Sequence, residues 1–139
     1  MGGTVQAVLI VEDDDNSRLA LRAVVEAGQY RVIEASDGES AVKMAVDCQP
    51  AIILMDLNLP RLNGIEATRQ IRANPDLRSI PIIAITGMDE ETCARASRAG
   101  CSEVLTKPCD TELVLTLLRW LAPDPGSSSG PRRRTQPPL

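Results

Sequence analysis

Residues 51–56, Ala-Ile-Ile-Leu-Met-Asp, form a short apolar run that ends in an acidic residue. A continuous apolar run of this length is typical of a strand that is buried on both faces of a parallel sheet. Further runs of similar character occur on either side of it along the chain. We therefore predict strands at Ala7–Val11, Arg31–Ala35, Ala51–Met55, Pro81–Ile85 and Glu103–Leu105.

Segments with helical spacing separate these runs, because apolar residues there recur every three or four positions. The spacing of Ser36 and Glu39 predicts a capping box, and Asp110 is the expected N-cap of the last helix. Strands that alternate strictly with helices indicate an α/β domain whose parallel sheet is covered on both faces. The predicted helices are Ser17–Ala27, Glu39–Cys48, Asn63–Arg72, Glu90–Ala99 and a last helix that includes Leu113–Leu121.

The composition is that of an ordinary globular domain with an aliphatic core. The chain has 139 residues, 43% of them hydrophobic, with no Phe, one Tyr and one Trp. Its net charge of −4 provides no basic footprint for nucleic acid, and no apolar run reaches the roughly 18 residues of a membrane span. Met1–Ala7 lacks the basic and apolar regions of a signal peptide. We therefore expect a cytoplasmic protein that binds neither nucleic acid nor membranes.

Histidine is absent and cysteine is sparse, which narrows the possible chemistry. The absence of histidine excludes His-based metal sites, His general bases and Ser-His-Asp triads. The four cysteines fit no zinc or CxxC spacing, so we expect free, mostly buried thiols. Any reaction must use carboxylates, hydroxyls, Lys, Arg or Cys.

Polar residues stand where the predicted strands end, and in open parallel sheets function lies at those carboxyl ends. Glu12 and Asp13 follow the first strand, Asp56 the third, Thr86 the fourth and Lys107 the fifth. If the first and third strands are neighbours, the carboxylates converge and call for a cation. Mg²⁺ prefers such oxygen ligands, and a carboxylate can act as a nucleophile toward phosphorus.

Each of these residues has a simpler interpretation when it is considered alone. Asp14 and its neighbour Asp15 are expected to cap the first helix. Thr86 could cap a helix, Lys107 could be a surface lysine, and Asp56 could be a turn residue. Their joint placement at one sheet edge favours a phosphoryl-accepting site instead.

Four segments together resemble the receiver domain of two-component response regulators. They are VLIVEDD (Val8–Asp14), IILMDLNLPRLNGIE (Ile52–Glu66), PIIAITG (Pro81–Gly87) and GCSEVLTKP (Gly100–Pro108). The resemblance covers roughly residues 5–122 and implies a flavodoxin-like, doubly wound, five-stranded parallel sheet in the order 2-1-3-4-5. We expect an extension (1–6) and a receiver domain (7–122), followed by a Pro/Gly/Ser/Arg tail (123–139) that is too poor in apolar residues to fold and is therefore expected to be disordered.

The resemblance also implies a role for each site residue. Asp56 would accept a phosphoryl group from a phosphohistidine of a sensor histidine kinase or a histidine phosphotransfer protein. Asp13, Asp56 and the backbone carbonyl of Asn58 would ligate Mg²⁺, with Glu12 acting through a water. Thr86 and Lys107 would bind the phosphoryl group, and the bond between Lys107 and Pro108 would be cis.

The sequence departs from the family pattern at two positions and leaves other functions open. Where the family usually has an aromatic residue, two positions before the Thr-Lys-Pro step, this chain has Val104, which offers no ring for the family's aromatic switch. A Phe that commonly follows Lys-Pro is Cys109 here. We expect no separate substrate, and output through the helix–strand–helix face of residues 89–121. The alternatives are a phosphatase of the haloacid dehalogenase type, whose second Asp is Asn58 here, and a phosphate-independent interaction module.

Overall fold

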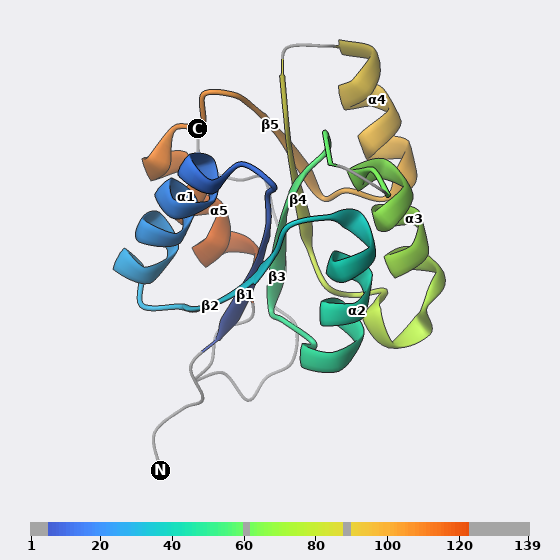
Figure 1. Cartoon of the computed structure of the whole chain (residues 1–139), viewed down its shortest axis with the longest axis horizontal. Helices are drawn as coiled ribbons and strands as arrows, with labels where there is room; N and C mark the ends of the chain where they lie inside the picture. Colours follow the sequence, from blue (N-terminus) through green and yellow to red (C-terminus); the bar gives the residue numbers. More distant parts are fainter. Residues whose placement is uncertain (1–5, 60–61, 88–89, 123–139) are drawn as a thin grey trace.

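The computed structural model describes residues 6–59, 62–87 and 90–122, where strands and helices alternate along the chain (Figure 1). The strands are β1 (Ala7–Val11), β2 (Arg31–Ala35), β3 (Ile52–Asp56), β4 (Ile82–Thr86) and β5 (Glu103–Thr106). The helices are α1 (Asp15–Ala27), α2 (Gly38–Cys48), α3 (Gly64–Ala73), α4 (Glu90–Ala99) and α5 (Thr111–Leu121), with a 3₁₀ turn at Pro75–Leu77.

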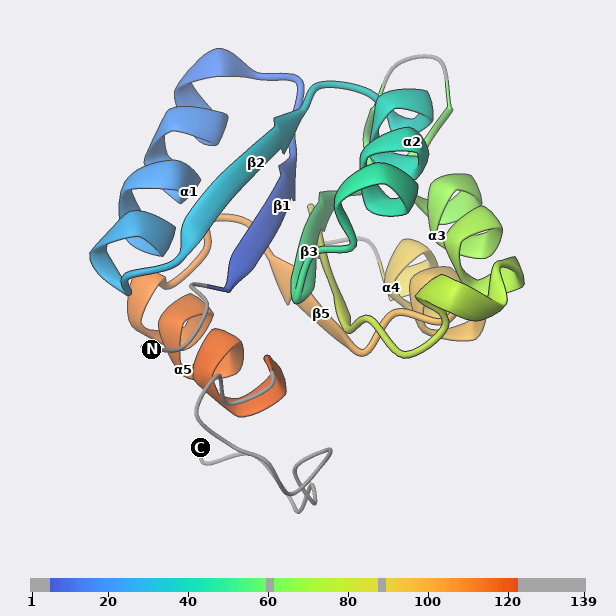
Figure 2. The same ribbon diagram turned by 90° about the horizontal axis from the view of Figure 1, so that it is seen from below.

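The strands form one parallel sheet in the order β2-β1-β3-β4-β5. Helices α1 and α5 cover one face, and α2, α3 and α4 cover the other (Figures 1 and 2). The predicted doubly wound, flavodoxin-like sheet and its order 2-1-3-4-5 are therefore confirmed. In this order β1 and β3 are neighbours, with Val11 opposite Met55. The residues that follow these two strands are thus brought to the same edge of the sheet.

The core lies in two aliphatic layers, one on each face of the sheet. Along β1, Val8 and Ile10 pack toward α1 and α5, whereas Leu9 and Val11 pack toward α2 and α3. All five residues of β3 are buried, as are all five of β4. Burial on both faces explains why these two strands are nearly continuous in apolar residues rather than alternating apolar and polar ones.

An aspartate is the N-cap of three of the helices. Two of these caps were predicted, but the predicted cap of α2 was wrong. Asp14 accepts a hydrogen bond from the Ser17 N–H, and Asp110 caps α5, as predicted. Helix α2 is capped by Asp37, which accepts from the Ser40 N–H at 2.7 Å, and not by Ser36. Asp37 directly precedes the first helical residue, and its carboxylate also brings a negative charge to the positive end of the helix dipole.

Other predictions need correction or lie outside the described residues. The cysteines are free as predicted, but Cys48 is exposed and the other three are only partly buried. In α2, Ala41 and Ala45 take the buried positions, which leaves Cys48 on the exposed side. The tail at residues 123–139, most of the extension at residues 1–6, and Asp89 of the expected output face lie outside the described part of the chain. Within the described ranges, no helix has the length and apolar character needed to cross a membrane.

Candidate functional site

The ends of four strands bring the predicted site residues to one edge of the sheet. Asp56 is the last residue of β3 and Thr86 the last of β4, one residue later than the predicted strand ends. Both side chains belong to residues that are 2% exposed. Lys107 follows β5 and is tied to β4 because its backbone N–H donates to the Thr86 carbonyl at 2.8 Å. The peptide bond between Lys107 and Pro108 is cis, as the resemblance implied.

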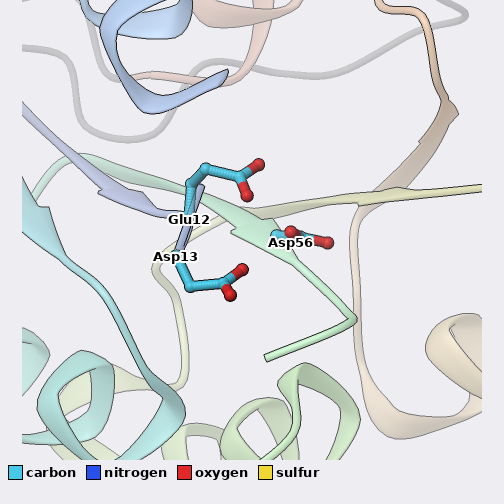
Figure 3. A group of neighbouring side chains, drawn as sticks. All are labelled: Glu12, Asp13 and Asp56. Atoms are coloured by element: carbon cyan, nitrogen blue, oxygen red, sulfur yellow. The ribbon is translucent and has the colours of Figure 1, made fainter. Parts of the chain in front are cut away.

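Three carboxyl groups meet at this edge. Glu12 and Asp13 come from the loop after β1, and one carboxylate oxygen from each lies within 4.8 Å of the others and of an oxygen of Asp56. Figure 3 shows the three side chains extending in the same general direction from the ends of β1 and β3. Glu12 is 2% exposed, whereas Asp13 is exposed. The cluster therefore has a buried interior and one carboxylate open to solvent.

Lys107 supplies the positive charge that faces the buried carboxylates. Its Nζ lies 3.3 Å from Asp56 Oδ2 and 3.9 Å from Glu12 Oε1. Burial alone would lower the pKa of Lys107, but the charges of Asp56 and Glu12 outweigh it and raise that pKa. Lys107 thus remains an ammonium group at neutral pH and offsets one negative charge of the cluster.

The negative charge that Lys107 does not offset affects the pKa of Glu12. Burial, followed by the hydrogen bond and charge of Asp56, raises the pKa of Glu12 to about 7, although Lys107 and the Asp14 N–H oppose this rise. Two buried carboxylates side by side resist joint ionisation unless a further cation is present. The donor set consists of hard oxygen atoms that are partly open to water, so the cluster fits a Mg²⁺-sized cation that keeps several waters.

The backbone after β3 is shaped to hold Asp56. The Asn58 N–H donates to Asp56 Oδ1 at 3.0 Å, and the Gly64 N–H donates to the Leu57 carbonyl at 3.1 Å. A Cβ on Gly64 would lie only 2.6 Å from the Asp56 carbonyl oxygen, so glycine is required for this close approach. The Asp56 carboxylate is thus held at one oxygen by a backbone N–H of its own loop and at the other by Lys107.

The two departures from the family pattern have different structural consequences. Val104 is partly buried and packs against the core layer that includes Ala84 and Ala96. Cys109 packs against the opposite layer beside α5. Burial, the largest effect, raises the pKa of the Cys109 thiol, which supports the interpretation of this residue as a packing residue.

The sequence analysis missed one side chain of this region. Arg18 was not among the predicted site residues, yet its Nη1 donates to the Glu12 carbonyl at 2.9 Å. A basic residue six positions after a strand exit has no distinctive pattern. The contact between Arg18 and Glu12 exists because the fold brings the first turn of α1 beside the loop that follows β1.

A parallel sheet with an acidic cluster and a lysine at its carboxyl edge has the features of a domain that binds a cation and a phosphoryl group. The family model for the response regulator receiver domain matches residues 8–119. The chain therefore belongs to the response regulator receiver domain family, and its function lies in two-component signal transduction.

Individual relatives agree with this assignment. The chain is 37% identical over 109 residues to Protein PilH of Pseudomonas aeruginosa, a match that covers 78% of this chain and 90% of the relative. It is 36% identical to the polar-differentiation response regulator DivK of Brucella anthropi, over 74% of this chain and 85% of the relative.

A solved structure extends the comparison to three dimensions. The receiver domain of the sensor histidine kinase PA1611 from Pseudomonas aeruginosa superposes with a TM-score of 0.77 at 37% identity, covering 85% of this chain and 98% of that domain. That crystal structure has a magnesium ion coordinated in its active-site cleft.

Proposed function

We propose that Asp56 is the phospho-acceptor of this receiver domain and that the phosphorylated state changes its binding to other proteins. The observation that carries the proposal is the position of Asp56 between Lys107 Nζ and the Glu12–Asp13 carboxylates. A buried carboxylate beside a fixed ammonium group is oriented for attack on a phosphorus atom. A phosphatase of the haloacid dehalogenase type would need a second Asp two residues after Asp56, where this chain has Asn58.

The reaction would transfer the phosphoryl group from a phosphohistidine of a sensor histidine kinase or a histidine phosphotransfer protein. An Asp56 carboxylate oxygen forms the new bond to phosphorus, and the phosphorus–nitrogen bond to the donor histidine breaks. The product on this chain is an acyl phosphate. Lys107 offsets charge on the phosphoryl oxygens, and the Thr86 hydroxyl, at the end of the neighbouring strand, is the expected hydrogen-bond donor to one of them.

The cation that this chemistry requires is Mg²⁺. Asp13, Asp56 and the backbone carbonyl of Asn58 would hold it directly, with Glu12 acting through a water. When bound, Mg²⁺ neutralises the carboxylate cluster and the charge on the phosphoryl oxygens. The acidic cluster of this chain and the magnesium ion in the PA1611 receiver domain support this assignment.

The remaining features of the proposal concern the chain as a whole. Residues 7–122 would form the receiver unit in the cytoplasm, flanked by the extension (1–6) and the Pro/Gly/Ser/Arg tail (123–139). It would turn over no separate substrate and would promote only its own phosphorylation and dephosphorylation. Output would pass to a protein target through the face of residues 89–121, with neither nucleic acid nor membrane as a partner. With Val104 in place of an aromatic ring, the signal from Asp56 would depend on a shift of the loop at residues 86–88, of which residue 88 lies outside the described part of the chain.

Incubation with acetyl phosphate and Mg²⁺, followed by intact-mass measurement, tests the proposal. The wild-type chain should gain one phosphoryl group, whereas Asp56→Asn should gain none. Asp47→Asn, which changes an exposed aspartate of α2, serves as the matched control and should behave as the wild type does. Multiple turnover of a small phosphate ester would instead indicate a phosphatase. An unchanged amide NMR spectrum with Mg²⁺ and a beryllofluoride mimic would favour a phosphate-independent module.

A further inference from the structure

The loop between β1 and α1 carries two of the three clustered carboxylates in only three residues, 12–14. The Glu12 N–H donates to the Ala35 carbonyl at 3.0 Å, which joins the loop to the end of β2. The Asp14 N–H donates to Glu12 Oε2 at 3.1 Å. These two contacts involve the N–H and the carboxylate of Glu12, but not its carbonyl group. The orientation of the peptide between Glu12 and Asp13 therefore depends on what the Glu12 carbonyl contacts.

Arg18 holds that carbonyl. From the first turn of α1, its Nη1 donates to the Glu12 carbonyl oxygen at 2.9 Å. The Arg18 side chain is only 21% exposed, so water competes weakly for this contact. A hydrogen bond from a charged donor is stronger than one between neutral groups, and here it constrains the peptide that joins Glu12 to Asp13.

The other nitrogen atoms of Arg18 are also engaged. Nη2 lies 2.6 Å from Asp15 Oδ1, and Nε lies 3.5 Å from Glu34 Oε1. Glu34 belongs to β2 and also pairs with Arg22, whose Nη1 lies 2.8 Å from Glu34 Oε2. Two carboxylates therefore offset the charge of the Arg18 guanidinium, which can orient the loop without placing an uncompensated positive charge beside a cation site.

We infer that Arg18 is a positioning residue for the cation site and acts through the backbone of Glu12. By fixing the Glu12 carbonyl to α1 and β2, it keeps the Glu12 and Asp13 carboxylates in register with Asp56. This inference rests on the proposed function, because it assigns a role toward the cation that the proposed site would hold. Arg22 shares the same partner, Glu34, so it offers a natural comparison.

The affinity for Mg²⁺ alone, measured on the full chain without any phosphoryl donor, tests this inference. A titration followed by the amide NMR signals of Asp13 and Leu57 reports binding directly. Arg18→Ala should weaken the apparent affinity at least fivefold, because the loop is then free to rotate its carboxylates away. Arg22→Ala also loses an ion pair to Glu34 but leaves the Glu12 carbonyl contact intact, so its affinity should stay within twofold of the wild type.

Arg18→Lys keeps the charge but loses the planar fork that reaches Glu12, Asp15 and Glu34 together. It should lie between the wild type and Arg18→Ala, and it serves in place of Arg18→Ala if that variant does not fold. If Arg18 had a purely structural role, Arg18→Ala and Arg18→Lys would have lower melting temperatures, but each folded variant would bind Mg²⁺ as tightly as the wild type. That result would overturn the inference. Failure of the wild type itself to bind Mg²⁺ would contradict the proposed function instead.

Discussion

Glu12→Gln in the metal-free protein provides a quantitative test of the site's electrostatics. The pKa of Glu12 rises from 4.5 to about 7, mainly because of burial and then because of Asp56. The folded protein therefore holds a proton between these pH values that the unfolded chain has already released. Stability contributed by this group is present below pH 4.5 and is lost as the pH rises to 7, so stability falls with increasing pH.

The size of the effect follows from the same shift. At about 1.4 kcal/mol per pKa unit, full ionisation of Glu12 costs up to about 3 kcal/mol of unfolding free energy at pH 8. Glutamine has nearly the same shape and cannot ionise. The Glu12→Gln variant should therefore be more stable than the wild type at pH 8, by up to about 3 kcal/mol, and much closer to it at pH 5.

Urea unfolding at pH 5, 6, 7 and 8 with a chelator present measures this difference. Glu39→Gln is the control, because Glu39 is exposed in the first turn of α2, and its difference from the wild type should stay within about 0.5 kcal/mol across the series. Added Mg²⁺ should stabilise the wild type most at pH 8, where the carboxylates are ionised. A gap between the wild type and Glu12→Gln that does not change with pH would refute this account of the cluster.

Three further substitutions test packing and charge elsewhere in the fold. Gly38→Ala should destabilise the protein by more than about 2 kcal/mol in urea unfolding, because a Cβ there would lie 1.8 Å from the Leu62 carbonyl oxygen; Gly87→Ala, whose Cβ would meet nothing within 4 Å, should be nearly neutral. Arg72→Met should lower the unfolding free energy by about 2–4 kcal/mol in the same assay, because the Arg72 guanidinium donates to the carbonyls of Gly100, Arg78 and Ile80. Arg69→Met, at an exposed position, should lower it by less than about 1 kcal/mol, and equal losses would argue against a stabilising role of the Arg72 hydrogen bonds. Lys107→Met should slow phosphorylation by acetyl phosphate at least tenfold in a mass-resolved time course, whereas Lys43→Met on the exposed side of α2 should not; an unchanged rate for Lys107→Met would exclude its charge from the reaction.

The parallel sheet and the edge that carries the site were predictable from local signals, whereas the strand order followed from the resemblance to receiver domains. Apolar runs indicated buried parallel strands, and polar residues follow the ends of four of these runs. Asp56 and Thr86 were placed correctly even though each proved to be the last residue of its strand rather than the first after it. A shift of one residue at a strand end does not alter which edge of the sheet a side chain occupies.

Features that depend on contacts between distant segments were not predictable. Ser36 has the spacing of a capping box with Glu39, but the N-cap of α2 is Asp37, which directly precedes the helix and is 4% exposed. The contact of Arg72 with Gly100 joins residues 28 positions apart, and Gly100 has a φ of +119°. Arg72 lies outside the quoted segments, and the segment that begins at Gly100 gives no sign of an arginine partner, because this contact arises only where α3 and the turn after α4 meet.

The most direct test of the central claim identifies the residue that carries the phosphoryl group. After reaction with acetyl phosphate and Mg²⁺, borohydride reduces an acyl phosphate to an alcohol with release of phosphate, so a phosphorylated aspartate becomes homoserine. Peptide mapping by mass spectrometry should find homoserine at position 56 and at no other aspartate. Homoserine at position 13, or none at position 56 when the intact chain has gained a phosphoryl group, would contradict the assignment of Asp56 as the acceptor.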